Sequence, residues 1–479
     1  MSRPGLISII TRKEVTEMVR DGRLRLLSVF VGCLAITALV FGLQQALEEQ
    51  HEREEAQARA AAQWEGQGEK NPHVAAHYGT HVFAPAAMTT AIDPGVSNFL
   101  GRSIKIEAHK RNLAAHSRAQ DAGANNQLGA FSVATILLSL MPLLIIALGY
   151  GAWGRERERG TLRQLLSTSV RRRDLFWGKL IGLGIVIAGL LIPAATILVG
   201  ALWWVSGGDF DVIMRLMVLF VSYFIYFSIF GALTLFVSAI LRTSQGALVA
   251  MIGLWGLFCL IVPRVATEVS ATSQPLISQA EFARRVATSL KSGIDGKTDR
   301  DTTIEATMKD LLAEEGFADA GLMLDPAVSR GAELRAEARW EDQIFDHHVN
   351  ALNDSIQRQE NLTAAFGLLS PFMAMRALST ALCGTDFDHH RHFSDYAESW
   401  RKSFVEVLNR EFAEKSGQSG WRYKAGPALW KKAPPFQYER PDIWHVLSTH
   451  RWTLATLFFW LLAALGLASW SAPRVRVVG

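Results

Sequence analysis

Histidine offers this chain its clearest capacity for metal chemistry, and its 13 histidines are unevenly placed. All of them fall in two polar stretches, residues 48–127 and 266–451. Within these stretches, two groups combine side chains that divalent transition metals accept as ligands. The first group is His73, His77 and His81, and the second is His389, His390 and His392 with Asp386 and Asp388. The four-residue step of the first group would align three imidazoles on one face of a helix.

Other features of the sequence argue against a metal at either group. Pro72 and Gly79 interrupt the stretch that would have to be helical, because proline lacks a backbone donor and glycine weakens a helix. Neither group contains a cysteine. We therefore predict no metal and no other cofactor. Six residues are kept as candidate ligands in case the fold brings them together: His73, His77, His81, Asp386, His389 and His392.

Motifs of common enzymes are missing from the sequence. There is no G-x-x-x-x-G-K-[ST] phosphate-binding loop, because Gly178-Lys179 is followed by Leu180 and lacks a glycine-rich approach. Neither H-E-x-x-H nor G-x-S-x-G occurs. A membrane-embedded hydrolase would place acidic or histidine side chains in its apolar segments, and none lies there. We therefore predict that the chain is not an enzyme and that any ATP hydrolysis occurs in a separate subunit.

Cysteine is too scarce to cross-link the polar stretches. Of the three cysteines, Cys33 and Cys259 lie in apolar runs and Cys383 stands alone in the second polar stretch. A disulfide framework is therefore excluded, and the polar stretches must rest on their own packing.

Six apolar windows determine the elements that would position all these residues. Each reaches or approaches the ~20 residues needed to cross a bilayer. We predict transmembrane helices at 26–47, 128–152, 180–205, 212–241, 247–265 and 452–471. The predicted fold is an all-α membrane protein with six transmembrane helices and a mainly helical extracytoplasmic domain built from two loops, 48–127 and 266–451.

The basic residues indicate on which side of the membrane each segment lies. The tail 1–25 holds six basic residues, segment 155–179 holds eight, and the tail 472–479 contains Arg474 and Arg476. By the positive-inside rule, segments 1–25, 153–179 and 472–479 are cytoplasmic, so both termini are inside and the polar stretches outside. The net charge of +4 is too small to indicate a nucleic-acid partner, and membrane lipid is the expected surrounding.

Both polar stretches carry helix signals. Residues 44–63 continue the first apolar helix without Gly or Pro, which predicts a projecting helix whose end must find a partner for Trp64. Residues 103–118 are predicted to be helical or strand-like. Further helices are expected at 277–292, 301–316, 326–367 and 394–417, with Asp301 and Ser394 as N-caps. We expect the two stretches to form one domain.

A charged segment, residues 155–179, separates the second and third apolar windows. It holds eight Lys/Arg against three Asp/Glu. After Gly160, the side chains of Leu162, Leu165 and Leu166 share one face of a short helix. Such a helix could dock in a groove on a soluble partner. The charge alone is equally typical of an ordinary positive-inside loop.

The order of residues in this segment resembles the coupling segment of type-2 ABC exporter permeases. The resemblance rests on Glu156-Arg157-Glu158-Arg159-Gly160-Thr161-Leu162, Leu165-Leu166-Ser167, Arg173 and Gly178-Lys179. In that family the ATP-binding subunit grips this segment. The resemblance therefore implies half of an exporter in the bacterial cytoplasmic membrane, paired with a second copy or with a similar permease. The docking residues it implies are Glu156, Glu158, Gly160, Thr161, Leu162, Leu165 and Leu166.

Two further regions resemble the same family. Lys13-Glu14 and Arg20-Asp21 are similar to the family's N-terminal interface helix, although a basic leader would look alike. The polar stretches resemble a bacterial subfamily with two exported insertions, related to permeases of multicopper-enzyme maturation. The matching residues are His77-Tyr78-Gly79, Asp93-Pro94-Gly95, Glu107-Ala108-His109, Ser370-Pro371 and Gly384-Thr385-Asp386.

Two classes of function remain open at this point. One is the membrane subunit of an ABC exporter that a separate ATPase energises, and the other is a non-transporting, membrane-anchored binding or sensory protein. The segment 155–179 favours the first class, because the second has no use for an amphipathic cytoplasmic helix. Arg215, near the outer end of the fourth window, is expected to snorkel to the interface, with a role in a substrate path as the alternative. No residue pattern identifies the cargo.

Overall fold

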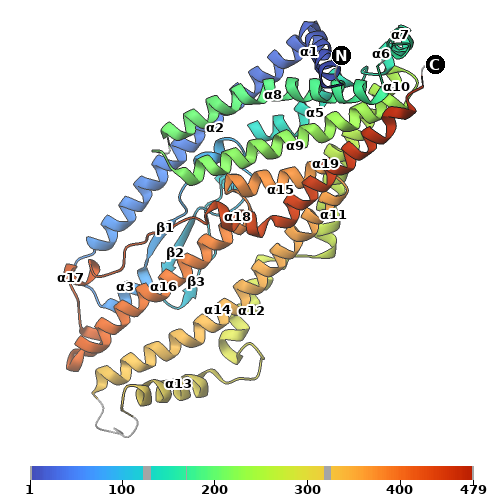
Figure 1. Cartoon of the computed structure of the whole chain (residues 1–479). Coiled ribbons are helices and arrows are strands. Elements are labelled where there is room, and N and C mark those ends of the chain that lie inside the picture. The colour runs from blue at the N-terminus through green and yellow to red at the C-terminus, as the bar shows by residue number, and fades with distance from the viewer. Residues whose placement is uncertain (1–2, 122–130, 169, 206, 318–324, 477–479) are drawn as a thin grey trace.

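The computed structural model describes residues 3–121, 131–168, 170–205, 207–317 and 325–476. Figure 1 shows a helical bundle at the end that carries both termini, and a second part that extends away from it. We call the second part the projecting domain; it comprises the described residues of 48–121, 274–365 and 387–442. In the described chain, six helices are long and apolar enough to cross a membrane: Arg25–Glu65, Val133–Glu158, Arg172–Val205, Phe210–Ile240, Ser244–Ser273 and Arg451–Arg474. The predicted all-α class is confirmed.

The bundle is built around α9 (Phe210–Ile240). In its most apolar window 67% of the residues are buried, against 11% in the first span. Four helices surround it: α5 (Val133–Gly149), α8 (Arg172–Val205), α15 (Pro371–Cys383) and α19 (Arg451–Ser471). A helix that is apolar on all sides can be buried completely, whereas the outer spans keep an apolar face exposed, as helices that face lipid do.

The fifth span changes its helical geometry midway. It consists of α10 (Ser244–Gly256), a π-helical turn (Leu257–Ile261) and α11 (Val262–Ser273). The carbonyl of Phe258, inside the π turn, accepts a hydrogen bond of 2.8 Å from the Ser370 hydroxyl. An irregular turn within a span is tolerated where another group satisfies the freed carbonyl.

The N-terminal helix α1 (Arg3–Arg20) packs closely on α8. Two glycines of α8 permit this approach: a Cβ at Gly178 would lie 2.3 Å from Cγ2 of Ile10, and one at Gly182 would lie 3.0 Å from Cβ of Glu14. The next helix, α2 (Gly22–Glu65), runs without a break from the bundle into the projecting domain (Figure 1). At 1.5 Å per residue its length is about 65 Å. The continuation predicted from residues 44–63 is therefore confirmed.

A small antiparallel sheet lies in the projecting domain. Its strands are β1 (Thr80–Phe83), β2 (Ser103–Glu107) and β3 (Lys110–Arg111) in the order β1-β2-β3, with Thr80 opposite Ile106. The strand alternative for residues 103–118 is thus the correct one. Helices α3 (Pro72–Tyr78), α14 (Pro326–Ala365) and α16 (Phe387–Lys415) contact the sheet. The projecting domain also contains α12 (Gln279–Ser292) and α13 (Arg300–Glu314), which pack on α14, and α17 (Pro427–Trp430), which packs on α2.

The two polar stretches share one apolar core. Trp64, at the end of α2, packs on the rings of Phe404 and Trp430 with centroid distances of 4.6 and 5.5 Å. Its indole nitrogen also donates to the Trp430 carbonyl at 3.0 Å. Val82 and Ile106 of the sheet are buried in the same core. The expectations of one domain and of a partner for Trp64 are both confirmed.

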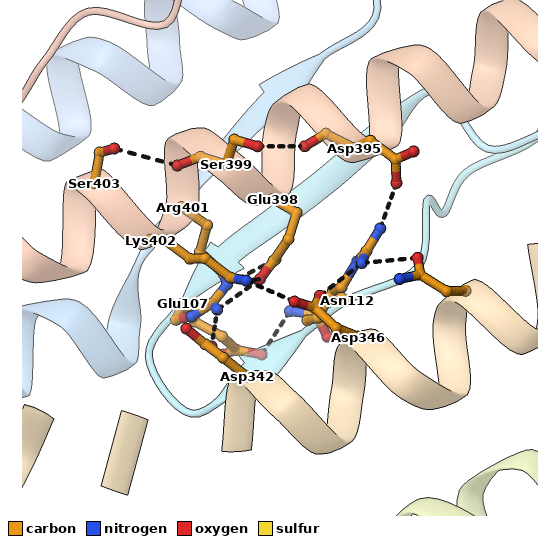
Figure 2. Close-up of polar contacts among 12 residues, drawn as sticks. Glu107, Asn112, Asp342, Asp346, Asp395, Glu398, Ser399, Arg401, Lys402 and Ser403 are labelled. Atoms are coloured by element: carbon orange, nitrogen blue, oxygen red, sulfur yellow. Dashed lines mark hydrogen bonds and ion pairs between the residues drawn. The ribbon is translucent and has the colours of Figure 1, made fainter. Parts of the chain in front are cut away.

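A charged network joins the sheet to α14 and α16 (Figure 2). Arg111 donates to Asp346 at 2.7 Å and to Asp395 at 2.6 Å. Arg401 donates to Glu398 at 2.7 Å and also pairs with Asp342. Because the two arginines are nearly fully buried, they need these carboxylates to offset the loss of water. The network therefore fixes the β2–β3 hairpin on the long helices.

Two predicted helix starts are wrong. The N-cap of α13 is Asp299, whose side chain accepts from the Thr302 backbone, and not Asp301. Helix α16 begins at Phe387 and its N-cap is Asp386, so Ser394 lies buried inside the helix. The reason is that an earlier Asp is available in each case to accept a backbone N–H, and the helix extends back to it.

Helix α15 lies against the bundle instead of the projecting domain. It contacts α9 and α19, and Cys383 at its end is only 1% exposed. The Ser379 hydroxyl donates to Asp93 at 2.5 Å and lies 3.2 Å from the Tyr223 hydroxyl of α9. The second polar stretch is thus not a single separate unit, because part of it returns to cover the central helix.

Candidate functional site

The charged segment between the second and third spans forms two short helices. They are α6 (Gly154–Glu158) and α7 (Thr161–Leu166), and they lie at the same end of the molecule as α1 and both termini (Figure 1). Gly160 joins them with φ of 74°, a left-handed conformation that favours glycine. The Thr161 hydroxyl then donates to the Glu156 carbonyl at 3.2 Å. Gly160-Thr161 therefore forms the turn that sets the direction of α7.

Glu156 belongs to a four-residue ion cluster that joins α6 to α1 and α8. Its Oε1 accepts from Lys13 at 2.8 Å and from Lys179 at 2.9 Å. Glu14 accepts from the same two lysines at 3.0 and 2.9 Å. The Lys179 side chain is 2% exposed. Removal of one member of such a buried cluster leaves charges without partners, which costs about 3–5 kcal/mol.

The ion cluster shifts the pKa values of two residues of the interface helix α1, Glu14 and Lys13. Burial alone would raise the pKa of Glu14, but Lys179 and Lys13 outweigh burial and lower it. Burial likewise opposes the charge on Lys13, but Glu14 and Glu156 raise the pKa of that lysine well above its ordinary value. Glu14 and Lys13 of α1 are therefore both charged at neutral pH.

Arg157 points into the bundle. Its guanidinium donates to the carbonyls of Leu241 at 2.6 Å and Arg242 at 2.9 Å, beyond the end of α9. It also donates to the Arg476 carbonyl near the C-terminus at 2.9 Å. The last carbonyls of a helix lack intrahelical partners and carry partial negative charge, so a buried cation there is stabilising. Sequence reasoning missed this residue, although it lies within the quoted motif.

Glu158 is also held within the chain. It accepts from the backbone N–H of Ser244 at 2.7 Å and from the Ser244 hydroxyl at 3.1 Å, at the start of α10. A carboxylate at a helix N-terminus satisfies a free N–H and complements the helix dipole. The sequence led us to expect Glu156 and Glu158 to face an ATPase. Instead they face α1, α8 and α10, because the fold brings lysines and a helix start within their reach.

The leucine face of α7 turns inward as well. Leu162 is 0% exposed, and Leu165 and Leu166 are half-buried against the bundle core. In the described conformation Leu162 is therefore not available to enter a partner's groove, and Leu165 and Leu166 are only partly available. The face that remains exposed carries Arg159, Arg163, Gln164, Ser167 and Thr168.

A cleft of about 530 Å³ lies beside the exposed face. Its walls come from α1, α5, α6, α7 and α8. Both signs of charge line it, namely Glu17, Asp21, Arg155 and Arg159, and Arg155 lies 3.8 Å from Asp21. A concave, charged surface at this place could receive a polar element of another protein.

The structure rearranges the first group of candidate metal ligands. His73 and His77 of α3 lie together, with 3.1 Å between their Nε2 atoms, but His81 lies on β1 outside the group. The third member is His109, from the β2–β3 turn, with its Nε2 3.4 Å from that of His73. The nitrogens of the three histidines lie within 4.8 Å of one another. Glu107-Ala108-His109 had been noticed only as part of a family resemblance.

Ionisation differs within this histidine group. Burial lowers the pKa of His73 and of His77. A hydrogen bond from His109 to Glu341 raises the pKa of His109.

The second group of candidate ligands is dispersed among other partners. His389 Nδ1 lies 2.5 Å from Asp386, and His450 lies 3.2 Å from the other oxygen of that carboxylate. Burial would raise the pKa of Asp386, but hydrogen bonds from His389 and His450 lower it strongly. His392 bonds the Tyr438 hydroxyl at 3.0 Å. These contacts fix the start of α16 and do not gather three ligands at one point among the described residues.

Arg215 does not snorkel. It is 6% exposed and pairs with Asp211 at 2.5 Å, and it also donates to the Pro441 carbonyl. His389 lies 3.4 Å from its guanidinium. The side chain therefore fastens the start of α9 to α16 and to the chain before α18 (Ile443–Thr449).

Comparison with known proteins shows to which family this architecture belongs. No curated protein matches the chain. A family model described as ABC-2 family transporter protein matches residues 8–471, which takes in most of α1, the first five candidate spans, all but the last three residues of the sixth, α6, α7 and the projecting domain. The chain therefore belongs to the ABC-2 family of transporter proteins and is a multi-pass membrane permease of an ABC transporter.

Proposed function

We propose that this permease is one half of an exporter and that a separate ATP-binding subunit drives it through α6 and α7. The observation that carries the proposal is the ion cluster of Glu156, Lys13, Glu14 and Lys179. In an ordinary solvated loop the ion pairs are exposed and each contributes less than about 1 kcal/mol, so they would not fix the loop in one position. A segment that transmits force must be rigidly joined to the elements that it moves.

The contacts of α6 define which elements would move together. Glu156 joins it to α1 and α8, Arg157 to the end of α9, and Glu158 to the start of α10. Leu162 then holds α7 on the same core. A displacement of α7 by a docked ATPase would reach the interface helix and three spans through direct contacts. The family membership does not favour the alternative of a non-transporting sensor.

The ATPase would contact the exposed face of α7 and the adjacent cleft. Arg159 and Arg163 make this face basic, so the complementary surface of the partner is expected to be acidic. In this proposal the leucines and both glutamates serve docking indirectly, because they hold α7 in place. Gly160 and Thr161 set its orientation.

The arrangement in the membrane is part of the same proposal. The basic tail, α6 and α7 would lie in the cytoplasm with both termini, and the projecting domain would lie outside a bacterial inner membrane. The resemblance of the polar stretches to permeases with two exported insertions supports this orientation. The exposed apolar faces of α2, α8 and α19 would meet lipid and a second permease, identical or similar, to complete the path.

The experiment compares two charge reversals in the full-length permease, co-expressed with an ABC ATP-binding subunit from the same genome. Arg163→Glu should weaken association by about tenfold, or ~1.4 kcal/mol, mainly through slower association, and the difference should shrink at high salt. Arg339→Glu, an exposed arginine on α14, is the matched control and should leave association unchanged. Equal association of both variants with the ATPase at low salt would remove α7 from the interface.

A further inference from the structure

Three imidazoles converge at one point of the projecting domain. His73 and His77 come from successive turns of α3, and His109 comes from the turn between β2 and β3. The Nε2 atom of His73 lies 3.1 Å from that of His77 and 3.4 Å from that of His109. In a tetrahedral site with metal–nitrogen bonds of 2.0–2.1 Å, the ligand nitrogens are about 3.3 Å apart. The two distances from His73 match this spacing, and all three nitrogens lie within 4.8 Å of one another.

The outer nitrogens of two rings face oxygen acceptors. His73 Nδ1 lies 3.1 Å from Oδ1 of Asn409, and His109 Nδ1 lies 2.5 Å from Oε2 of Glu341. When both rings are neutral, these acceptors place the ring proton of each on Nδ1, and both Nε2 atoms then present lone pairs to each other. Two lone pairs at this distance cannot form a hydrogen bond. A cation between them satisfies both, and a carboxylate behind a ligating histidine is the usual support of such a cation.

The surrounding structure holds the third histidine in an unusual conformation. His109 has φ of 63°, in the left-handed region that residues other than glycine seldom adopt. The turn is fixed on both sides: Ala108 donates to the Ala76 carbonyl of α3 at 2.9 Å, and Arg111 is paired with Asp346 and Asp395. Figure 2 shows Glu107, at the end of β2, beside Asp342 of α14 and Arg401 of α16. The imidazole positions are thus set by the fold.

We propose that His73, His77 and His109 bind a divalent transition metal of the Zn²⁺ and Cu²⁺ class, with the fourth coordination position open to solvent. Three nitrogen ligands select this class over Ca²⁺ and Mg²⁺, which take oxygen ligands. His73 is buried while His77 is exposed, so the ion is reached from the His77 side. The ligands come from the first polar stretch, and their supports Glu341 and Asn409 come from the second. Metal binding would therefore stabilise the contact between the two stretches, because the ligands of the first are hydrogen-bonded to residues of the second.

The direct test measures metal stoichiometry on the full-length permease in detergent. The protein is stripped with a chelator and titrated separately with Zn²⁺, Cu²⁺ and Co²⁺. One tight equivalent of Zn²⁺ is expected, with Cu²⁺ tighter and Co²⁺ weaker. Bound Co²⁺ should show the intense visible absorption of a low-coordinate nitrogen site. If the stripped protein takes up no stoichiometric ion, the three rings share a proton instead and the proposal is wrong.

Single substitutions separate this site from adventitious binding to other histidines. His77→Ala removes an exposed ligand, and His109→Ala removes the ligand from the hairpin. Each should weaken Zn²⁺ binding by more than the roughly 10- to 100-fold that loss of a supporting residue costs, and Glu341→Gln should fall within that range. The matched control is His81→Ala on β1, which should bind like the wild type.

A second measurement covers the case in which a variant folds poorly. Zn²⁺ should raise the thermal midpoint of the wild type and of His81→Ala, and should leave that of His77→Ala unchanged. The metal-free midpoints of these three proteins should agree, because His77 is exposed. A Zn²⁺-dependent rise of equal size in His77→Ala would assign the binding to another place and refute the site.

Discussion

The two ends of this molecule both bury charge, but they bury it in different arrangements. At the bundle end, Glu14 and Glu156 share Lys13 and Lys179, and these four residues come from α1, α6 and α8. In the projecting domain, Arg111 of β3 pairs with Asp346 of α14 and Asp395 of α16, and Arg401 of α16 pairs with Asp342 of α14 (Figure 2). The first cluster ties the short helix α6 to two other helices, whereas the second fixes a strand between two long helices.

This difference teaches what each network does. The bundle cluster ties the short α6 to α1 and α8, so a displacement of α6 reaches both helices, whereas the arginine network holds the β2–β3 hairpin between α14 and α16. Each network contains a buried atom without a hydrogen-bond partner in the described structure, Oε2 of Glu156 in the first and Nε of Arg111 in the second. The bundle end is therefore suited to transmission and the projecting domain to holding a fixed shape, such as three histidines around a metal.

The prediction with the largest expected effect tests whether the two ends of the molecule lie on opposite sides of the membrane. Cys383 and Cys259 are buried, so native cysteines give no useful label there. Ser403→Cys, exposed on α16, should react with an impermeant thiol reagent on intact cells. Ser167→Cys, exposed after α7, should react only after permeabilisation. The wild type is the control for background at Cys33. The reverse pattern of labelling would invert the topology.

A second prediction tests the ion cluster of Lys13, Glu14, Glu156 and Lys179. Lys179→Ala leaves Glu14 and Glu156 with Lys13 alone, and the free energy of unfolding should fall by about 3–5 kcal/mol. Denaturant unfolding of the purified permease measures this value. The control is Lys179→Met combined with Glu156→Gln, which removes opposite charges together and should recover most of the loss. If both proteins lose the same stability, the packing of Lys179 matters and its charge does not.

A third prediction applies the same test to the projecting domain. Arg401→Ala should cost about 3 kcal/mol, at the lower end of the range for a buried ion pair, because Lys402 remains 3.9 Å from Glu398. The loss should appear as faster proteolysis of the projecting domain, while association with the ATPase stays unchanged. Reduced association in this variant would show that the two ends are coupled, contrary to the comparison above.

The smallest expected effect concerns pH. Glu14 has its pKa lowered from 4.5, so its contribution to stability is present above pH 4.5 and is lost as the pH falls through its folded-state pKa. Lys13 has its pKa raised from 10.5, so its contribution is present below pH 10.5 and is lost at higher pH. The stability difference between wild type and Glu14→Gln should therefore stay constant from pH 5 to 10. A change in this stability difference near neutral pH would mean that Glu14 or Lys13 is not charged throughout this range.

The amino-acid sequence by itself determined the helices and the spans. Length and apolar composition predict a span without knowledge of its neighbours, because the bilayer imposes one thickness on all of them. The run from residue 44 to residue 63 likewise predicts the continuation of α2, since helix propensity is a local property. Trp64 could be recognised as needing a partner, but Trp430, 366 residues away, could not be named.

Only the tertiary structure decided what the charged and metal-binding residues contact. Glu156 meets Lys13 across 143 residues, and His73 meets His109 across 36, and neither partner is marked by any regular spacing. Local periodicity pointed to His81 instead, because it counts residues along one helix, and α3 ends before that position. Buried charges and ligand nitrogens take their partners from whichever elements the core packs beside them. That choice depends on the whole fold, and the physical reason is that burial removes the water that would otherwise serve as the partner.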